Sequence, residues 1–160
     1  MNDQAGHFGV ASREVRLSYD GLEFLRAIRD GVLPMPPICE TLGYTLLEVD
    51  PARVVFGGTP GHRHYHPGGF VHAGFAATLL DSAMACAVIT TLAKGEMSAT
   101  LEFKINLVRM LTAETGPVRA EGRVVHRGRT VATADAELRD EAGKLLAHAN
   151  TTCMVFPAEE

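Results

Sequence analysis

The stretch from Tyr65 to Gly95 constrains the fold more than any other part of this sequence. It has the pattern of a glycine-rich turn followed by a helix, because nearly every residue from His72 to Thr91 is small or apolar. A helix that is apolar on most sides is buried on most sides. Asp81 is the one formally charged residue of that helix before Lys94. A carboxylate in a buried helix is costly unless it is paired or used, so Asp81 is the first candidate functional residue.

The C-terminal end of this helix can also be predicted. We expect it to end at Lys94 and Gly95, a cation in the last turn followed by a residue that tolerates positive φ. A helix of this length is about long enough to cross a bilayer, but His72, Thr78 and Asp81 interrupt the part that would have to span it. We therefore expect a buried core helix in a protein without a membrane partner.

Length, charge and cysteine usage limit the possible classes of protein. No Pro/Gly/Ser-rich linker divides the 160 residues, which suits one main domain (residues 37–160) preceded by a tail and a short amphipathic helix (residues 1–36). The net charge of −4, with Lys and Arg scattered, argues against a nucleic-acid partner. The three cysteines have no paired spacing and the N-terminus has no secretory pattern, so we expect a cytoplasmic protein.

The remaining pattern predicts a helix followed by a sheet. Apolar residues three positions apart predict a short amphipathic helix at residues 20–31, and a helical turn is expected at residues 38–42. Residues 1–17 are polar and expected to be loose. Strands are expected at residues 44–50, 53–59, 100–108, 116–127, 130–139 and 145–156. This order is typical of an α+β fold with an antiparallel sheet of about six strands around one long central helix.

The strand at residues 100–108 alternates clearly between apolar and polar side chains. Strict alternation places Thr100 on one face with Glu102, Lys104 and Asn106, and it places Leu101, Phe103, Ile105 and Leu107 on the other.

The segment HPGGFVHAGFAATLLDSA resembles the motif region of the hotdog-fold acyl-CoA thioesterases, specifically the PaaI-like group that includes the phenylacetate-degradation thioesterase. The pattern of that family is Asn-Pro-x-Gly-x-x-His-Gly-Gly, with an Asp nine residues after the His. The matching positions are Pro67, Gly69, His72, Gly74 and Asp81. The resemblance extends from about residue 37 to residue 156 and implies a hotdog fold and thioester hydrolysis. Two positions depart from the pattern, since His66 replaces the Asn and Ala73 replaces the first Gly.

The first turn of the helix suits an oxygen that becomes negative during acyl transfer. It presents unpaired N–H groups and the positive end of the helix dipole, and Ala73 and Gly74 lie there. Asp81 is eight residues further on, about 12 Å along the same helix. If two copies of the helix run antiparallel across a two-fold axis, Asp81 of one copy meets the amides of the other. We therefore expect a homodimer with its sites at the interface. The resemblance also implies a dimer, and we expect two dimers to form a tetramer.

Roles can be assigned within such a site. Asp81 is the general base for water or the nucleophile on the thioester carbonyl, and His66 and His72 position the water or the carbonyl. The resemblance implies that Thr100 hydrogen-bonds the water. Gly69 and the turn formed by Arg127, Gly128 and Arg129 are expected to bind the acyl-CoA substrate, the two cations through its phosphates. An ordinary solvated hairpin fits that turn equally well.

Other functions fit parts of the sequence, and no cofactor or bound metal is expected. A non-catalytic acyl-CoA-binding module would keep the fold and lose turnover. A metal hydrolase is a second alternative, because His62, His64 and His66 would share one face of a strand. A hotdog dehydratase is a weaker third alternative.

Ala76, Ala77 and Ala83 leave room beside Asp81 for an aryl group or a medium chain. Delivery by CoA and delivery by a carrier protein both remain open.

Overall fold

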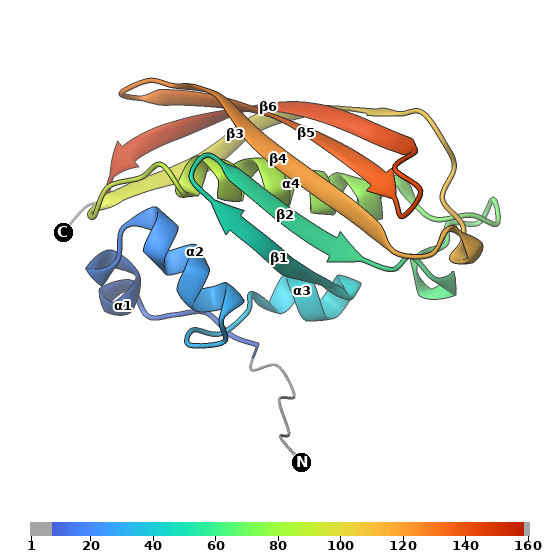
Figure 1. The fold of residues 1–160 in the computed structure, drawn as a ribbon, viewed down its shortest axis with the longest axis horizontal. Coiled ribbons are helices and arrows are strands. Elements are labelled where there is room, and N and C mark those ends of the chain that lie inside the picture. Colours follow the sequence, from blue (N-terminus) through green and yellow to red (C-terminus); the bar gives the residue numbers. More distant parts are fainter. Residues whose placement is uncertain (1–7, 159–160) are drawn as a thin grey trace, which may run out of the picture.

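The computed structural model describes residues 8–158, in which a six-stranded antiparallel sheet curls around one long helix, α4 (Ala73–Ile89) (Figure 1). The strand order is β1-β2-β4-β5-β6-β3. The strands are β1 (Tyr44–Asp50), β2 (Arg53–Gly58), β3 (Glu96–Leu107), β4 (Val118–Arg127), β5 (Val131–Asp140) and β6 (Leu145–Pro157). The expected α+β class and the hotdog architecture are both confirmed.

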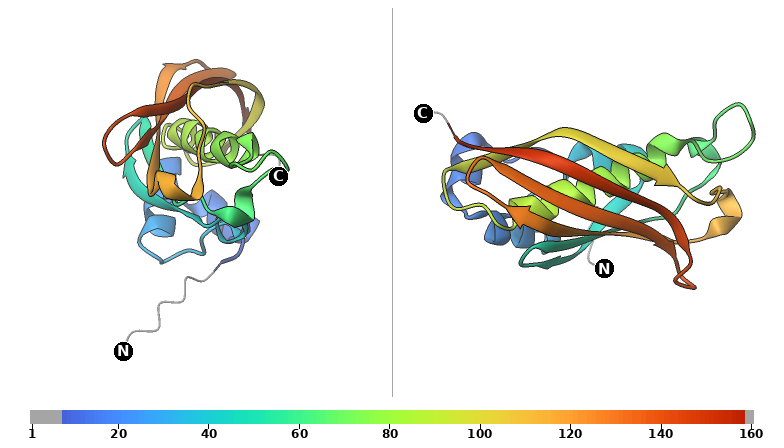
Figure 2. Two further views of the ribbon diagram at one scale, coloured as in Figure 1. Left: turned by 90° about the vertical axis from the view of Figure 1, so that its right-hand side faces the viewer. Right: turned by 90° about the horizontal axis from the view of Figure 1, so that it is seen from above.

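Helix α4 lies in the hollow of the curled sheet, which the end-on view shows most directly (Figure 2). Its core-facing side chains are fully buried, among them Leu79, Leu80, Ala83 and Met84. The backbone of β4 comes very close to this helix at Gly122, where a Cβ atom would lie 2.3 Å from the carbonyl carbon and oxygen of Ala83. The sequence therefore needs a glycine here for the sheet to close around the helix.

The end of α4 differs from the prediction. The helix stops at Ile89 with Thr90 as its C-cap, so Lys94 does not lie in its last turn. The hydroxyls of Thr90 and Thr91 donate to the carbonyls of Ala87 and Val88, which gives side-chain partners to two of the last carbonyls of the helix. The Thr90 hydroxyl also accepts a hydrogen bond from the Ala52 N–H in the β1–β2 turn. Gly95 does adopt positive φ, at 81°, in the turn into β3.

Three short helices precede the sheet: α1 (Arg13–Ser18), α2 (Gly21–Arg29) and α3 (Pro37–Leu42). The amphipathic helix and its Asp20 cap were predicted correctly, as was the helical turn before β1. The expectation that residues 1–17 are loose is wrong for residues 13–17, which belong to α1. The Ser12 side chain caps this helix by accepting from the Val15 N–H. Residues 1–7 lie outside the described part of the chain. The division into residues 1–36 and 37–160 stays a prediction. None of the helices in the described residues is long and apolar enough to cross a membrane.

A β-bulge in β3 overturns the strict alternation expected there. The register of β3 against β6 shifts between Thr100 and Glu102. Thr100 pairs with Cys153 and Phe103 pairs with Thr151, and both partners are buried on the side of the sheet that faces α4. Because a bulge adds one residue to one strand, Thr100 and Phe103 share a face instead of lying on opposite faces.

Candidate active site

The loop that leads into α4, here called the motif loop (residues 65–72), is a tight turn held by its own backbone. The His66 N–H donates to the Phe70 carbonyl at 3.0 Å, and the Gly69 N–H donates to the His66 carbonyl at 3.0 Å. Gly69 has φ +87°, a conformation that only glycine adopts without strain. Its position in the motif therefore has a structural reason that does not involve substrate.

The rings of His66 and His72 make the same kind of bond to this turn. His66 Nδ1 accepts from the Gly68 N–H at 2.9 Å, and His72 Nδ1 accepts from the Gly74 N–H at 2.8 Å. The ring centroids lie 6.2 Å apart. Because Nδ1 is the acceptor in both rings, the proton of each neutral imidazole is on Nε2. The loop thus presents two Nε2–H donors that are free of these backbone bonds.

One backbone amide of the helix start is unoccupied. Ala73 is the first residue of α4, and its N–H has no hydrogen-bond partner within residues 8–158. The Gly74 N–H is already donated to His72. Of the two amides expected to bind an oxyanion, the Ala73 amide is therefore the one that is available.

A cavity of about 570 Å³ opens beside this donor cluster, and we call it the motif-loop cavity. One wall is the motif loop and the start of α4, and the other is the end of β3 and the segment after it, at residues 107–111. Its lining residues are His66, Pro67, Phe70, Val71, His72, Ala73, Ala76, Leu107, Val108, Arg109, Met110 and Leu111. No local sequence pattern pointed to the second wall, because residues 107–111 reach the motif loop only through the sheet order.

Asp81 lies halfway along α4 and does not line the motif-loop cavity. Its side chain is half-buried, and the Thr100 hydroxyl donates to its Oδ1 at 3.1 Å. Burial raises the pKa of the Asp81 carboxyl, and the bond from Thr100 partly opposes that rise. A carboxylate with a raised pKa is a stronger base toward water. The bulge in β3 is what places the Thr100 hydroxyl on this face.

The surface around Asp81 is uncovered and largely apolar. A stripe of α4 that includes Ser82, Ala85 and Ile89 remains partly exposed next to Asp81. Phe103 and Leu107 point toward the α4 side of the sheet, yet they are 38% and 47% exposed, because β3 is an edge strand whose one neighbour in the sheet is β6. A long edge strand with exposed apolar residues is a typical surface for pairing with another chain.

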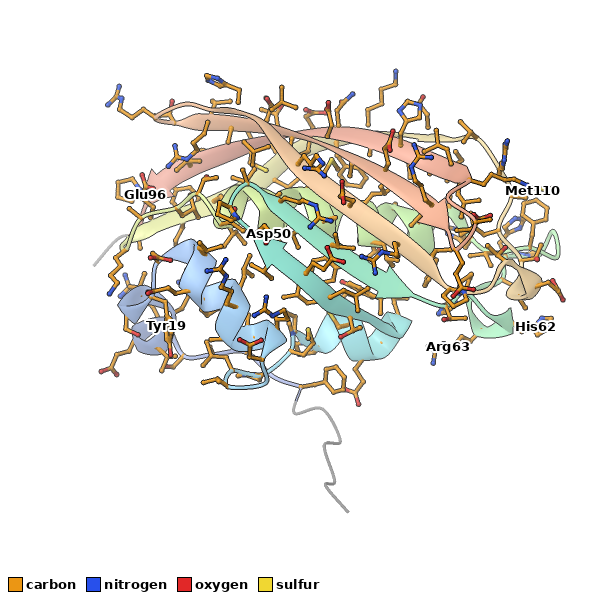
Figure 3. The ribbon with its side chains drawn as sticks, viewed as in Figure 1. Tyr19, Asp50, His62, Arg63, Glu96 and Met110 are labelled. Atoms are coloured by element: carbon orange, nitrogen blue, oxygen red, sulfur yellow. The ribbon has the colours of Figure 1, made fainter. Side chains whose placement is uncertain are left out.

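The turn of Arg127, Gly128 and Arg129 lies at the other end of the molecule from the motif-loop cavity. Figure 3 shows Glu96, the partner of Arg127, at one end and Met110, from the cavity wall, at the other. Arg127 donates to the Glu96 carboxylate at 2.8 Å and to the Gly128 carbonyl, and its buried Nε has no partner in the described residues. Arg129 is exposed and is the freer of the two cations.

The three alternating histidines do not share a strand face. Residues His62–His64 form a 3-10 helix, and residues 8–158 contain no group of three His, Cys, Asp or Glu side chains placed to hold a metal ion. His64, one of the three, is a buried structural residue, a role that the sequence did not indicate. Its Nδ1 accepts from the Gly61 N–H, and its Nε2 lies 3.0 Å from the Leu42 carbonyl, to which it donates. Burial and the nearby Arg63 charge lower its pKa.

His64 also supports the motif loop directly. Its backbone carbonyl accepts a hydrogen bond from the His72 N–H at 2.7 Å, and its ring packs on Phe75 in the first turn of α4, with ring centroids 4.5 Å apart. The donor cluster is therefore fixed by a residue that lies outside the motif itself.

Comparison with known proteins agrees with this architecture. Residues 68–147 match the model of the thioesterase superfamily. A phenylacetic acid degradation-related protein from Ralstonia eutropha, provisionally described as a thioesterase, is 30% identical, with a TM-score of 0.74 over 82% of this chain and 98% of that chain. A mutant structure of the phenylacetic acid degradation protein PaaI from Thermus thermophilus is 32% identical, with a TM-score of 0.67 over 74% of this chain and 97% of that chain.

A curated relative is more distant. The Bacillus subtilis protein ComA2, provisionally named an esterase, is 28% identical over 119 residues, which are 74% of this chain and 94% of that protein. The fold and the site thus define a hotdog thioester hydrolase. The chain belongs to the thioesterase superfamily.

Proposed function

We propose that this protein hydrolyses an acyl-CoA thioester, with an aryl or medium-chain acyl group, at sites shared between the two subunits of a homodimer. The observation that carries the proposal is the separation of the two halves of the site on one helix. The unpaired Ala73 amide begins α4, and Asp81 follows about 12 Å along it, on a partly exposed apolar face. An antiparallel second copy of α4 would bring Asp81 of the partner subunit to the first turn of this one.

The aryl or medium-chain preference is supported by the motif-loop cavity and by the relatives. The cavity is mostly apolar, and its wall includes the Phe70 ring. Two of the similar structures are of proteins named for phenylacetic acid degradation. An apolar cavity with a few convergent polar groups suits an apolar acyl group whose carbonyl must be held in one orientation.

The chemistry follows from the donors at the helix start. The thioester carbonyl oxygen accepts from the Ala73 N–H and from the Nε2–H of His66 or His72, which stabilises the negative charge of the tetrahedral intermediate. Asp81 of the partner subunit removes a proton from water as the water oxygen bonds to the carbonyl carbon. Collapse of the intermediate breaks the carbon–sulfur bond, and the leaving thiolate takes up the proton that Asp81 removed from water, which gives CoA and a free acid and restores the Asp81 carboxylate. Direct attack by Asp81 remains the alternative, through an anhydride that water then hydrolyses.

The first test measures thiol release from a panel of aryl and straight-chain acyl-CoA thioesters. Asp81→Asn keeps the size of the side chain and removes the base, so turnover should fall by about 10²-fold to 10⁴-fold. Asp135→Asn is the matched control, because Asp135 is an exposed carboxylate on β5. Equal rates for Asp81→Asn and wild type would remove Asp81 from the mechanism, and tight acyl-CoA binding without any turnover would contradict hydrolysis of these substrates.

The second test asks whether each site uses both chains. Ala73→Pro removes the N–H of Ala73, and proline is tolerated at the first position of a helix. His72 has φ −61° and ψ 138°, the conformation that a residue before proline prefers. Both single variants should be inactive. If they are unfolded and refolded together in equal amounts, half of the dimers are mixed and each has one intact site, so activity should return to about a quarter of wild type. No recovery from well-folded mixed dimers would contradict a shared site.

A further inference from the structure

We propose that Arg109 binds a phosphate of the substrate's phosphopantetheine arm and so makes the enzyme select phosphorylated thioesters; this rests on the proposed thioesterase function. Arg109 is the one Lys or Arg residue among those that line the motif-loop cavity. The same cavity is lined by Ala73, His66 and His72, so a cation and the expected oxyanion donors border one space. The sequence did not point to Arg109, because nothing in its local pattern separates it from other surface arginines.

The backbone of Arg109 is held firmly at the cavity wall. The N–H groups of Val108 and Arg109 both donate to the Leu146 carbonyl in β6, at 2.9 and 3.1 Å. Two residues later, the Leu111 carbonyl accepts from the Val71 N–H of the motif loop at 2.9 Å, and Leu111 is 4% exposed. The segment is thus tied to the sheet on one side and to the motif loop on the other, so the position of Arg109 relative to Ala73 is fixed.

The side chain of Arg109, by contrast, is unengaged. It is exposed and makes no ion pair or side-chain hydrogen bond with any residue that the structure describes. The arginines on the outer face of the sheet behave differently. Arg53, Arg119, Arg123 and Arg139 each meet a glutamate, and Arg127 meets Glu96. A cation left unpaired at the wall of a site is available to an anionic ligand.

Electrostatics explains why such a cation is needed. The chain has a net charge of −4, so it repels a polyanion such as CoA at long range. A guanidinium binds phosphate oxygens through two parallel N–H···O bonds, which adds orientation as well as attraction. The side chain of Arg109 is exposed at the cavity wall, so it would hold the arm on the solvent side while the acyl group fills the apolar interior and the Ala73 amide holds the thioester carbonyl. Arg129, the exposed cation of the turn between β4 and β5, serves as the comparison in the test.

The kinetic test uses one acyl group on three carriers: CoA, 4′-phosphopantetheine and N-acetylcysteamine, which has no phosphate. Arg109→Gln should raise KM for the first two carriers about tenfold with little change in kcat, and it should leave kcat/KM for the N-acetylcysteamine thioester unchanged. Arg109→Lys should recover part of the loss, because it keeps the charge without the bidentate geometry. Arg129→Gln shows what removing a different cation does. An equal loss on all three carriers, or no loss with CoA, would overturn the proposal.

A binding measurement separates this proposal from the function on which it rests. Titration calorimetry with CoA itself needs no turnover, and Arg109→Gln should weaken CoA binding about tenfold relative to wild type. Raising the salt concentration should reduce this difference, because it screens the charge pair. Unchanged CoA affinity in Arg109→Gln overturns the assignment of Arg109 even if the enzyme is an active thioesterase. If Arg109→Gln lost hydrolysis only of substrates whose acyl group carries a carboxylate, the proposal would also be overturned. Arg109 would then bind the acyl group and not a phosphate of the arm.

Discussion

The contact between Gly122 and helix α4 predicts that Gly122→Ala destabilises the protein strongly. The new Cβ would lie 2.3 Å from the carbonyl carbon and oxygen of Ala83 and 2.7 Å from the nitrogen of Met84. Because non-bonded carbon atoms prefer about 3.5–4.0 Å, β4 and α4 would have to separate by about 1 Å. The atoms contacted belong to the backbone of a buried helix, so no side chain can rotate out of the way.

The magnitude follows from two opposing terms. Overpacking of a core costs about 1–3 kcal/mol, and a contact with backbone on both sides belongs at the upper end. Replacing glycine by alanine also restricts the unfolded chain, which offsets about 0.4–1 kcal/mol. The net loss is about 2 kcal/mol, which corresponds to a Tm lower by about 4–8 °C for a chain of this size. Turnover should fall as well, since Asp81 lies two residues before Ala83 on the helix that must move.

Thermal unfolding followed by circular dichroism, at one protomer concentration, measures this loss. Gly57→Ala is the matched control. It also lies in a strand, but its Cβ would meet the Leu47 Cδ1 at 2.5 Å, the end of a side chain that can rotate away. Its stability should stay within about 0.5 kcal/mol of wild type. If Gly122→Ala melts at the same temperature as Gly57→Ala, the close approach of β4 to α4 is not what requires a glycine at this position.

Two further variants test the surroundings of the site. Thr100→Val removes the hydrogen bond that lowers the pKa of Asp81, so the acid limb of the kcat/KM profile should move to higher pH. Turnover in mildly acid buffer should fall by roughly tenfold, as the loss of a hydrogen bond to a charged group implies. An acid limb at the same pH as in wild type would contradict this. His64→Phe should cost about 2–4 kcal/mol, because the Gly61 N–H and the Leu42 carbonyl lose their partner. Since the folded state lowers the pKa of His64, the unfolded chain binds more protons, and the stability of wild type should decrease as pH falls from about 6.5 through the lowered pKa. Urea unfolding at pH 5 and pH 7.5 should show a smaller pH dependence in His64→Phe than in wild type, and an unchanged dependence would refute this role.

Local sequence patterns determined the main elements. The apolar run after His72 predicted α4, because residues that are neighbours in the sequence show whether a helix is buried. The six strands were predicted in the same way, from short segments of neighbouring residues. The nine-residue spacing from His72 to Asp81 fixed their separation along one helix as soon as that helix was recognised. The spacing also implied that one chain alone could not bring the Asp81 carboxylate to the helix start.

The tertiary structure decided what lies next to these elements. Thr100 reaches Asp81 because a bulge in β3 changes its face, and a period-two pattern carries no sign of a bulge. Arg127 is engaged by Glu96, which is 31 residues away in the chain. Arg109 borders the motif loop because the strand before it, β3, is an edge strand that pairs with β6. In each case the cause is a contact between segments far apart in sequence, and such contacts depend on strand order and register, which local propensity and spacing do not encode.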